Sequence, residues 1–177
     1  VPEKALPYPW ESCIIAGGGW AWVPDPKFIS PREAVHLLVD IVAKGGNLLL
    51  NIGPAPDGTW PEEAYTLLGA MGRWMKVNGE AIYGTRAMAP HKDGKTCITR
   101  KGDDTWYLYY MADEGEQMPA SLSMGGLTLP AGARVTVIGS GAVCKWKNGT
   151  DSFTVMPPPQ ARKNPPSDYV WVMKISL

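Results

Sequence analysis

The sequence has few of the residues that build metal centres. Only two histidines occur, His36 and His91, and they are far apart in the chain. Three cysteines, Cys13, Cys97 and Cys144, are too widely spaced for a metal knuckle, and their odd number does not imply a disulfide framework, although one pair could still bridge. The sequence therefore gives no support for a metal site, and no cofactor is expected.

The chain also lacks an excess of charge. Lysines plus arginines equal aspartates plus glutamates at 17 each, so no long-range field attracts nucleic acid or an anionic membrane. No apolar run approaches the ~20 residues that span a bilayer, and the amino terminus lacks the pattern of a signal peptide. We therefore expect a soluble chain without a targeting signal. Because it begins with Val1 rather than methionine, we also expect that residues have been removed upstream.

One stretch, residues 44–54, organises the rest of the chain. Residues 47–53 suit a strand better than a helix, because Gly-Gly precedes the apolar run and Gly-Pro follows it. Such a run is typical of parallel sheets that are covered on both faces. Side chains alternate across a strand, so Asn47 and Asn51 share one face, opposite the face of Leu50. We expect these amides to meet polar neighbours or to line a wet cavity, which is the first hint of a site.

Two helices are predicted on either side of this strand. Ser30 and Glu33 form a capping box around a proline, and apolar residues follow at helical spacing, which predicts a helix over 31–44. A second helix is predicted over 61–78, with acidic residues in its first turn and a left-handed stop at Asn78-Gly79. The order helix, strand, helix is typical of an α/β layer or barrel.

The residues before this unit are rich in proline, glycine and tryptophan and show no sustained periodicity. We therefore predict a long irregular loop over 1–29, and loops of that length are uncommon unless they have a function. No second strand is predicted in this part of the chain. The strand at 47–53 is thus expected to find its partner strands in residues outside this chain or in another chain.

From about residue 86 the sequence changes to short runs of β-branched and aromatic residues. Six strands without helices are predicted, over 96–100, 105–111, 134–138, 142–146, 152–156 and 170–175. Tight turns at 102–104 and at Asn148-Gly149 link neighbouring strands. This pattern is typical of an antiparallel β-sandwich. The predicted fold class is therefore α/β followed by all-β, with one domain over 1–85 and a second over 86–177.

Two carboxyl groups near the amino terminus, those of Glu3 and Glu11, are the candidate catalytic groups. A carboxyl group beside an aromatic ring loses water, which favours its neutral form and suits a general acid. Four tryptophans could present flat faces to a sugar ring: Trp10, Trp20, Trp22 and Trp60. The alternative is that Glu11 caps a turn and the tryptophans are core residues, and local features alone favour this alternative.

A series of motifs runs in order through residues 1–85. They are Trp10-Glu11-Ser12-Cys13, Trp20-Ala21-Trp22, the run over 44–54, Asp57-Gly58, and Asn-Gly-Glu-Ala-Ile-Tyr over 78–83. In order and spacing this series resembles the α-L-fucosidases of glycoside hydrolase family 29. The β-sandwich that follows is similar in kind to the C-terminal domain of that family, but it carries no diagnostic motif.

The resemblance implies a (β/α)-barrel catalytic domain, of which this chain holds the last portion, with residues 46–53 as the closing strand. It implies retaining hydrolysis of terminal α-L-fucose from glycoconjugates by an aspartate nucleophile and a carboxylic acid/base, two groups that lie ~5–5.5 Å apart in retaining enzymes. The family's nucleophile lies upstream of the Trp-Glu motif and is absent here. The chain alone is therefore expected to be inactive.

The resemblance also implies roles for individual residues. The family places an acid/base in a Thr-Pro-Glu sequence before its Trp-Glu motif, and Glu3, preceded by valine and proline, looks like that residue. Glu11 matches the glutamate of the Trp-Glu motif and is the second candidate. Trp20 matches the aromatic residue expected to pack on fucose, although Ala and Trp here replace the family's following Gly and Tyr. Trp10 and Asn51 complete the predicted substrate-binding residues.

The partners implied are a fucosylated glycan, together with the missing barrel portion or a second copy of the chain. Family members are commonly secreted, periplasmic or lysosomal, which is the expected location. The alternative function is a non-catalytic carbohydrate-binding or scaffold module, in which the β-sandwich of residues 86–177 binds the sugar. A third reading is a piece of a cleaved enzyme whose other half remains associated.

Overall fold

The strand at the centre of the sequence pattern has a partner within the chain. In the computed structural model, which describes residues 1–177, β2 (Gly46–Asn51) pairs in parallel with β1 (Trp10–Ile15). The prediction of an irregular segment over 1–29 is therefore wrong for β1, and so is the expectation of a strand without a partner. Because Trp-Glu-Ser-Cys-Ile-Ile has no regular alternation of polar and apolar residues, its extended form depends on pairing with β2, which local sequence does not reveal.

The two predicted helices are confirmed as α1 (Pro31–Ala43) and α2 (Glu62–Asn78). The capping box forms at α1, where Ser30 Oγ accepts from the Glu33 N–H at 3.2 Å and Glu33 Oε2 accepts from the Ser30 N–H at 2.7 Å. The predicted end of α2 at Asn78 is confirmed, but the predicted left-handed conformation is wrong, because Gly79 is right-handed and opens a short 3-10 turn, η1 (Gly79–Ala81). The buried Asn78 amide donates to the Trp74 carbonyl oxygen at 3.0 Å, which keeps this turn helical.

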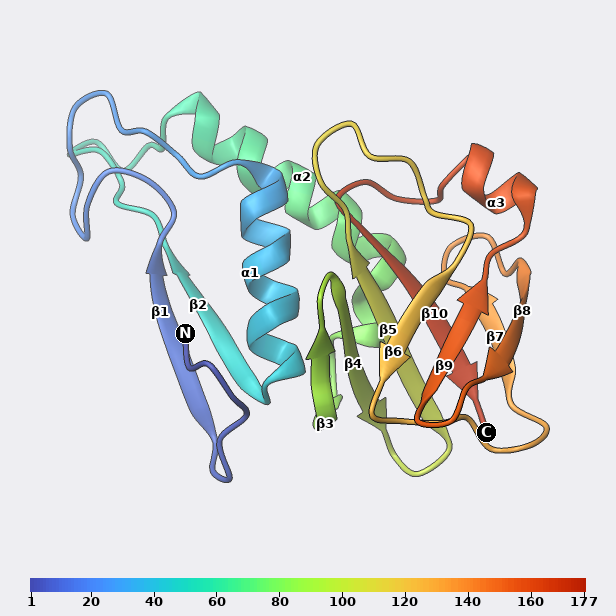
Figure 1. Cartoon of the computed structure of the whole chain (residues 1–177). Helices are drawn as coiled ribbons and strands as arrows, with labels where there is room; N and C mark the ends of the chain where they lie inside the picture. The colour runs from blue at the N-terminus through green and yellow to red at the C-terminus, as the bar shows by residue number, and fades with distance from the viewer.

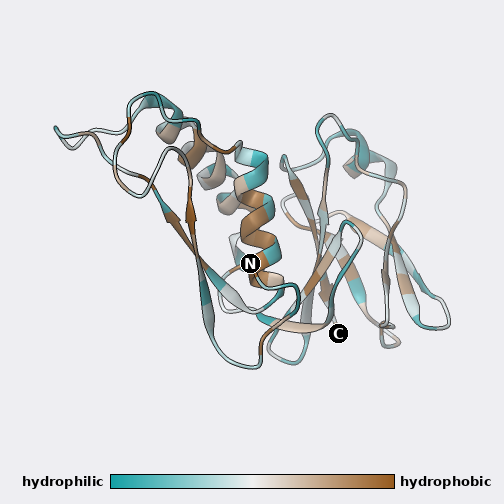
Figure 2. Cartoon of the chain, turned by 60° about the vertical axis from the view of Figure 1, so that its left-hand side comes forward, coloured by the Kyte–Doolittle hydropathy of each residue, from teal (hydrophilic) through white to brown (hydrophobic).

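The β1–β2 pair is covered on one face only. Leu50 and Ile52 pack with Ala34 of α1 and Leu67 of α2 in a small cluster. On the other face, Leu49 is 47% exposed. Figure 1 shows α1 standing between the two strands and the larger sheet, and Figure 2 shows hydrophobic residues along α1 and on the carboxy-terminal halves of the strands. The expectation that both faces are covered is therefore wrong within this chain.

The second half of the chain forms one antiparallel sheet of eight strands, which extends the six predicted. They are β3 (Arg86–Asp93), β4 (Thr96–Lys101), β5 (Thr105–Met111), β6 (Leu122–Gly125), β7 (Arg134–Val137), β8 (Val143–Asn148), β9 (Ser152–Met156) and β10 (Val170–Ser176). Their order is β3-β4-β5-β10-β7-β8-β9-β6, and the end strands β3 and β6 contact each other. The sheet is thus curved into a nearly closed barrel around one core, an arrangement compatible with the predicted sandwich.

Three elements of this half were missed. Strand β3 contains Pro90, and its register with β4 shifts between Ala87 and Lys92, because proline cannot donate to a ladder. Strand β6 is too short to show a period. The expectation of no helix is also wrong, since α3 (Pro159–Lys163) lies in the proline-rich segment before β10. Its Ala161 is 3% exposed and belongs to the core of the barrel-like sheet, so the segment is held by packing.

A shared hydrophobic cluster joins the two halves of the chain. Val39 of α1 and Trp74 of α2 pack with Tyr109 of β5 and Val172 of β10, all of them buried. The Trp74 indole N–H donates to the Val170 carbonyl oxygen at 2.9 Å. The helices therefore form a middle layer between the strand pair and the large sheet (Figure 1). The boundary between residues 85 and 86 stays a prediction.

A charged cluster reinforces this junction. Asp40 of α1 accepts from Lys44 Nζ at 2.7 Å and from Lys92 Nζ of β3 at 3.0 Å, and its side chain is 16% exposed. Burial by itself raises the pKa of the Asp40 carboxyl group, but the hydrogen bonds and charges of the two lysines outweigh it, and the pKa lies below its ordinary value of 3.8. The ionised form is thus favoured by folding.

Replacing Asp40 by asparagine is expected to lower the free energy of unfolding at neutral pH by about 1–3 kcal/mol, because two lysines lose their partner. Because folding lowers the pKa of the Asp40 carboxyl group, its ionised form stabilises the fold fully at a pH above the pKa in the unfolded chain, near 3.8. This stabilisation is lost as the pH falls through the lower pKa in the folded protein. The difference in unfolding free energy between parent and variant should therefore shrink below pH 3.8. Urea denaturation across the acid range measures it, with the exposed Asp151→Asn as control, and a difference that does not change with pH would contradict the assignment.

Candidate functional site

The uncovered face of the β1–β2 pair collects the polar residues singled out by the sequence. The register aligns Glu11 with Asn47 and Ile15 with Asn51. Residues aligned in a parallel pair point to the same side, and alternation places these four on one face. That face is the one that the helices leave open. Glu11 and the two amides therefore share an accessible surface.

Trp10 lies on the opposite face and packs against the backbone. Its indole N–H donates to the Lys44 carbonyl oxygen at 3.2 Å. Its ring covers Gly46 so closely that a Cβ atom built there would lie 2.5 Å from the ring. The contact explains why glycine opens β2, and it gives Trp10 a packing role at the amino end of the strands.

Asn51 holds the loop that carries Trp20. Its Nδ2 atom donates to the Trp20 carbonyl oxygen at 3.1 Å and lies 3.5 Å from the Gly19 carbonyl oxygen. A Cβ atom at Gly53 would lie 2.6 Å from the Ala21 carbonyl carbon, so the loop passes directly over the end of β2. The expectation that Asn51 meets polar neighbours is confirmed. The close packing of this loop against Gly53 was not predicted, although a glycine directly after a strand is a signal of close backbone approach.

Exposed aromatic side chains follow the carboxy-terminal ends of both strands. Trp20 is 60% exposed and Trp22 is 44% exposed. After β2, the Asp57 carboxylate accepts from the backbone N–H of Thr59 at 3.0 Å and from its hydroxyl at 2.7 Å, bonds that lower the pKa of Asp57. This ordered turn leads into Trp60. We call the two loops, residues 16–29 and 52–61, the aromatic rim.

The two candidate carboxyl groups are not brought together with the rim. Glu3 and Glu11 are both exposed, and neither makes a hydrogen bond or an ion pair. Glu11 precedes Ile15, the last residue of β1, by a stretch of strand that spans about 13 Å at ~3.3 Å per residue. Asn47 is exposed and makes no side-chain hydrogen bond, unlike Asn51. The structure therefore joins Asn51 to Trp20 by a hydrogen bond, and the side chains of Glu3 and Glu11 make no hydrogen bond to either.

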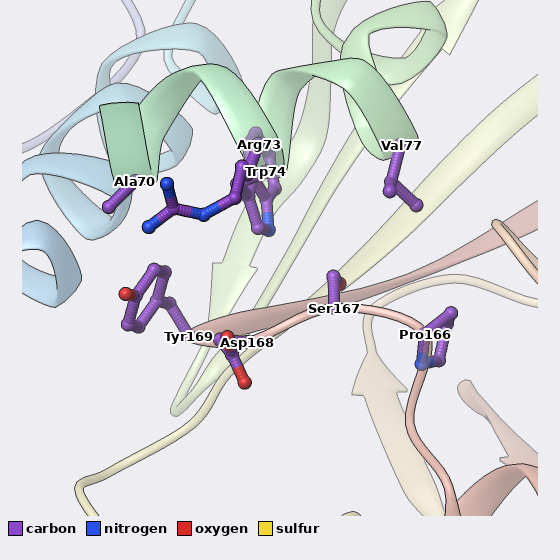
Figure 3. Close-up of a pocket in the computed structure, with 8 residues that line it drawn as sticks. All are labelled: Ala70, Arg73, Trp74, Val77, Pro166, Ser167, Asp168 and Tyr169. Carbon is purple, nitrogen blue, oxygen red and sulfur yellow. The ribbon is translucent and has the colours of Figure 1, made fainter. Parts of the chain in front are cut away.

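A cavity of about 190 Å³ lies elsewhere, between the second half of α2 and the segment before β10. Figure 3 shows Arg73 of the helix facing the Tyr169 ring across it. None of the predicted site residues lines this cavity. It belongs to the junction between the two halves of the chain.

The structure gives no metal site and no disulfide, and it buries two of the three thiols. All three cysteines are free, and burial raises the pKa of Cys97 to about 12 and that of Cys144 to about 11. No group of three or more His, Cys, Asp or Glu side chains is arranged to hold a metal ion. Among the helices of the structure, none combines the length and the apolar character needed to cross a membrane.

Comparison with known proteins identifies the relatives of this chain. A family model described as alpha-L-fucosidase matches residues 1–80. Plasma alpha-L-fucosidase of Rattus norvegicus is 39% identical over 110 residues, which cover 60% of this chain and 23% of the relative. Alpha-L-fucosidase of Branchiostoma floridae is 28% identical over 182 residues, which cover 98% of this chain and 40% of the relative.

A solved structure extends the match through the large sheet. The alpha-fucosidase of Thermotoga maritima, in complex with a mechanism-based inhibitor, superposes with a TM-score of 0.85 at 25% identity, covering 100% of this chain and 42% of that one. The parallel strand pair, its helices and the barrel-like sheet are thus all matched within the fold of a glycoside hydrolase. The chain is therefore similar to the C-terminal portion of α-L-fucosidases, and it spans less than half the length of these relatives.

Proposed function

We propose that this chain forms the last part of a retaining α-L-fucosidase, which removes terminal α-L-fucose from glycoconjugates when the rest of the catalytic barrel is present. The observation that carries the proposal is the parallel β1–β2 pair, covered by helices on one face and open on the other. In a (β/α) barrel the helices lie outside and the other face of each strand points inward. The proposed domains are a barrel portion over 1–85 and a β-domain over 86–177.

The aromatic rim is the proposed sugar-binding part of this portion of the barrel. Active sites of such barrels lie at the carboxy-terminal ends of the strands, which is where Trp20 and Asn51 are placed. Trp20 packs on the apolar face of fucose in this proposal, and Asn51 positions it through the backbone. Trp10, on the other face, fixes the amino end of the strands, so its contribution to sugar binding is indirect.

The proposed chemistry needs two carboxyl groups, of which this chain supplies one. Glu3 is the first candidate for the acid/base, and Glu11 is the second. In a retaining reaction the nucleophile attacks the anomeric carbon while the acid protonates the leaving oxygen, from ~5–5.5 Å apart. The aspartate nucleophile would come from the barrel portion upstream. Glu3 lies in an exposed segment, which the complete barrel would hold in place.

The partners in this proposal are a fucosylated glycan and the missing barrel portion, with a second copy of the chain as the alternative cover for the open strand face. A secreted location is supported by the plasma enzyme among the relatives. Lysosomal and periplasmic locations are the other proposed compartments.

The proposal is tested by assaying residues 1–177 alone and after refolding with an upstream barrel portion. The chain alone should not release nitrophenol from an aryl α-L-fucoside, whereas the assembled barrel should. Turnover by the chain alone that disappears in Glu3→Gln would overturn the idea of an incomplete site. Binding of fucosylated glycans without turnover in the assembled barrel would favour the non-catalytic alternative.

A further inference from the structure

A groove lies at the amino end of β2, the end opposite the aromatic rim. It has a volume of about 510 Å³ and lies between the segment before β1 and the β3–β4 hairpin. The polar side chains of its lining include Asn47, Arg86 and Arg100. Its charged side chains are two arginines, and no carboxylate lines it. Figure 1 shows this end of β2 beside the foot of α1, next to β3.

The two arginines are placed directly opposite each other. The register of β3 and β4 aligns Arg86 with Arg100, and both are exposed. Like charges in directly opposed positions destabilise an antiparallel pair. Nothing in the fold requires this arrangement, because neither side chain contributes to the hydrophobic core. The pairing concentrates two positive charges at one point of the groove wall.

Most of the donor groups of these arginines lack protein partners. Arg86 donates to the Thr85 carbonyl oxygen at 2.8 Å, and Arg100 donates to the Gly102 carbonyl oxygen at 3.3 Å. The one carboxylate in ion-pair contact is that of Asp103, fully exposed and 3.7 Å from Arg100. A guanidinium group has five N–H donors in a fixed fork, so the two together keep most of their donors available.

Apart from the exposed Asp103, no carboxylate makes an ion pair with either arginine. Asp40, the carboxylate at the foot of α1, is already shared by Lys44 and Lys92. Glu11 aligns with Asn47 across β1 and β2, but it does not line the groove and makes no ion pair. The exposed amide of Asn47 adds further hydrogen-bond donors to the wall.

We propose that this groove binds a tetrahedral oxyanion, a sulfate or phosphate group, between Arg86 and Arg100. Guanidinium forks match the oxygen spacing of such anions and bind them through paired charge-assisted hydrogen bonds. The anion would also remove the repulsion between the opposed arginines. The site is separate from the aromatic rim and does not depend on the proposed hydrolase activity. Its occupant is either a free inorganic anion or a sulfate ester carried by a glycan.

Isothermal titration of residues 1–177 with sodium sulfate and sodium phosphate at low ionic strength tests the proposal. One anion should bind per chain, and Arg86→Gln or Arg100→Gln should each weaken binding about tenfold, because each removes a charge-assisted contact. Arg134→Gln, an exposed arginine of β7 outside the groove, should change affinity less than about twofold, because its attraction is long-range and screened. Equal losses in all three variants, or unchanged binding in the two groove variants, would overturn the site.

Thermal melting separates an anion site from a structural role. Without added anion, Arg100→Gln should melt at the same temperature as the parent or higher, because a like-charge contact is removed. At a sulfate concentration near the dissociation constant of the parent, sulfate should raise the melting temperature of the parent and of Arg134→Gln more than that of Arg100→Gln, which binds about tenfold more weakly. An Arg100→Gln variant that is destabilised without anion and stabilised by sulfate as much as the parent would contradict the proposal.

The same titration distinguishes the two sources of the anion. Tighter binding of a sulfated methyl fucoside than of inorganic sulfate would support a glycan sulfate ester as the occupant. Tighter binding of inorganic sulfate or phosphate would support a free anion. Binding of none of these ligands, or equal binding of unsulfated methyl fucoside, would overturn the proposal.

Discussion

Replacing Trp74 by alanine is expected to remove about 3–5 kcal/mol of the free energy of unfolding, the usual cost of deleting a large buried aromatic side chain. The side chain is 2% exposed and lies in the cluster that joins α1 and α2 to β5 and β10. Its N–H also donates to the Val170 carbonyl oxygen at 2.9 Å. The substitution therefore leaves a cavity and takes a hydrogen bond from the same junction.

The melting behaviour of this variant also tests the predicted boundary between residues 85 and 86. Because the cluster contains residues of both halves, we expect a single transition that shifts as a whole. Urea denaturation followed by circular dichroism, with hydrogen exchange of β10 as a local probe, measures it. Trp20→Ala is the control, and since its side chain is 60% exposed it should cost less than about 0.5 kcal/mol. A helical part that melts separately while β10 stays protected would mean that the two halves are independent domains.

The elements that the sequence predicted well are those with local causes. The start of α1 follows from the Ser30 to Glu33 capping box, which forms as expected. Strands β5 and β9 match their predicted ranges, because aromatic and β-branched runs between turn residues need no distant information. The turn at Asn148-Gly149 links β8 to β9, as its composition indicates. In each case the residues that decide the structure are neighbours in sequence.

The elements that were missed depend on distant contacts. Strand β1 is extended because it pairs with β2, and its own residues show no alternation. The pair Asn78-Gly79 has the composition of a left-handed stop, yet Gly79 is right-handed at φ −59° because Asn78 is buried and bonded to Trp74. Whether an amide is buried and which strands pair depend on residues far away in the chain. A local sequence pattern therefore cannot predict either.

The candidate site divides in the same way. Alternation along β2 correctly placed Asn47 and Asn51 on one face, but the sequence pattern did not predict that this face is left uncovered within the chain. The partner of Asn51, the carbonyl oxygen of Trp20, is a backbone atom of a loop, and the side-chain sequence does not encode its position. For the same reason the sequence could nominate Glu3 and Glu11 but could not set their distances from the rim.

The largest functional effect is expected at Glu3. In a protein that carries this chain behind a complete amino-terminal barrel portion, Glu3→Gln should lower kcat for a fucosylated oligosaccharide by about 10²–10⁴-fold, the usual contribution of a positioned general acid. Glutamine keeps the shape of the side chain but cannot transfer a proton. The loss should be smaller for the first step with an aryl fucoside, because nitrophenolate leaves without protonation.

The two substrates separate the acid/base from a positioning residue. With the aryl fucoside, Glu3→Gln should form the fucosyl-enzyme normally and hydrolyse it slowly, since the same group must then activate water. A burst of nitrophenol followed by slow turnover is therefore expected. Glu11→Gln, if Glu11 only orients the site, should slow both substrates by a similar factor and give no burst. The opposite result would be a burst in Glu11→Gln together with a loss in Glu3→Gln that does not depend on the leaving group. That result would identify Glu11, on strand β1, as the acid/base in place of Glu3.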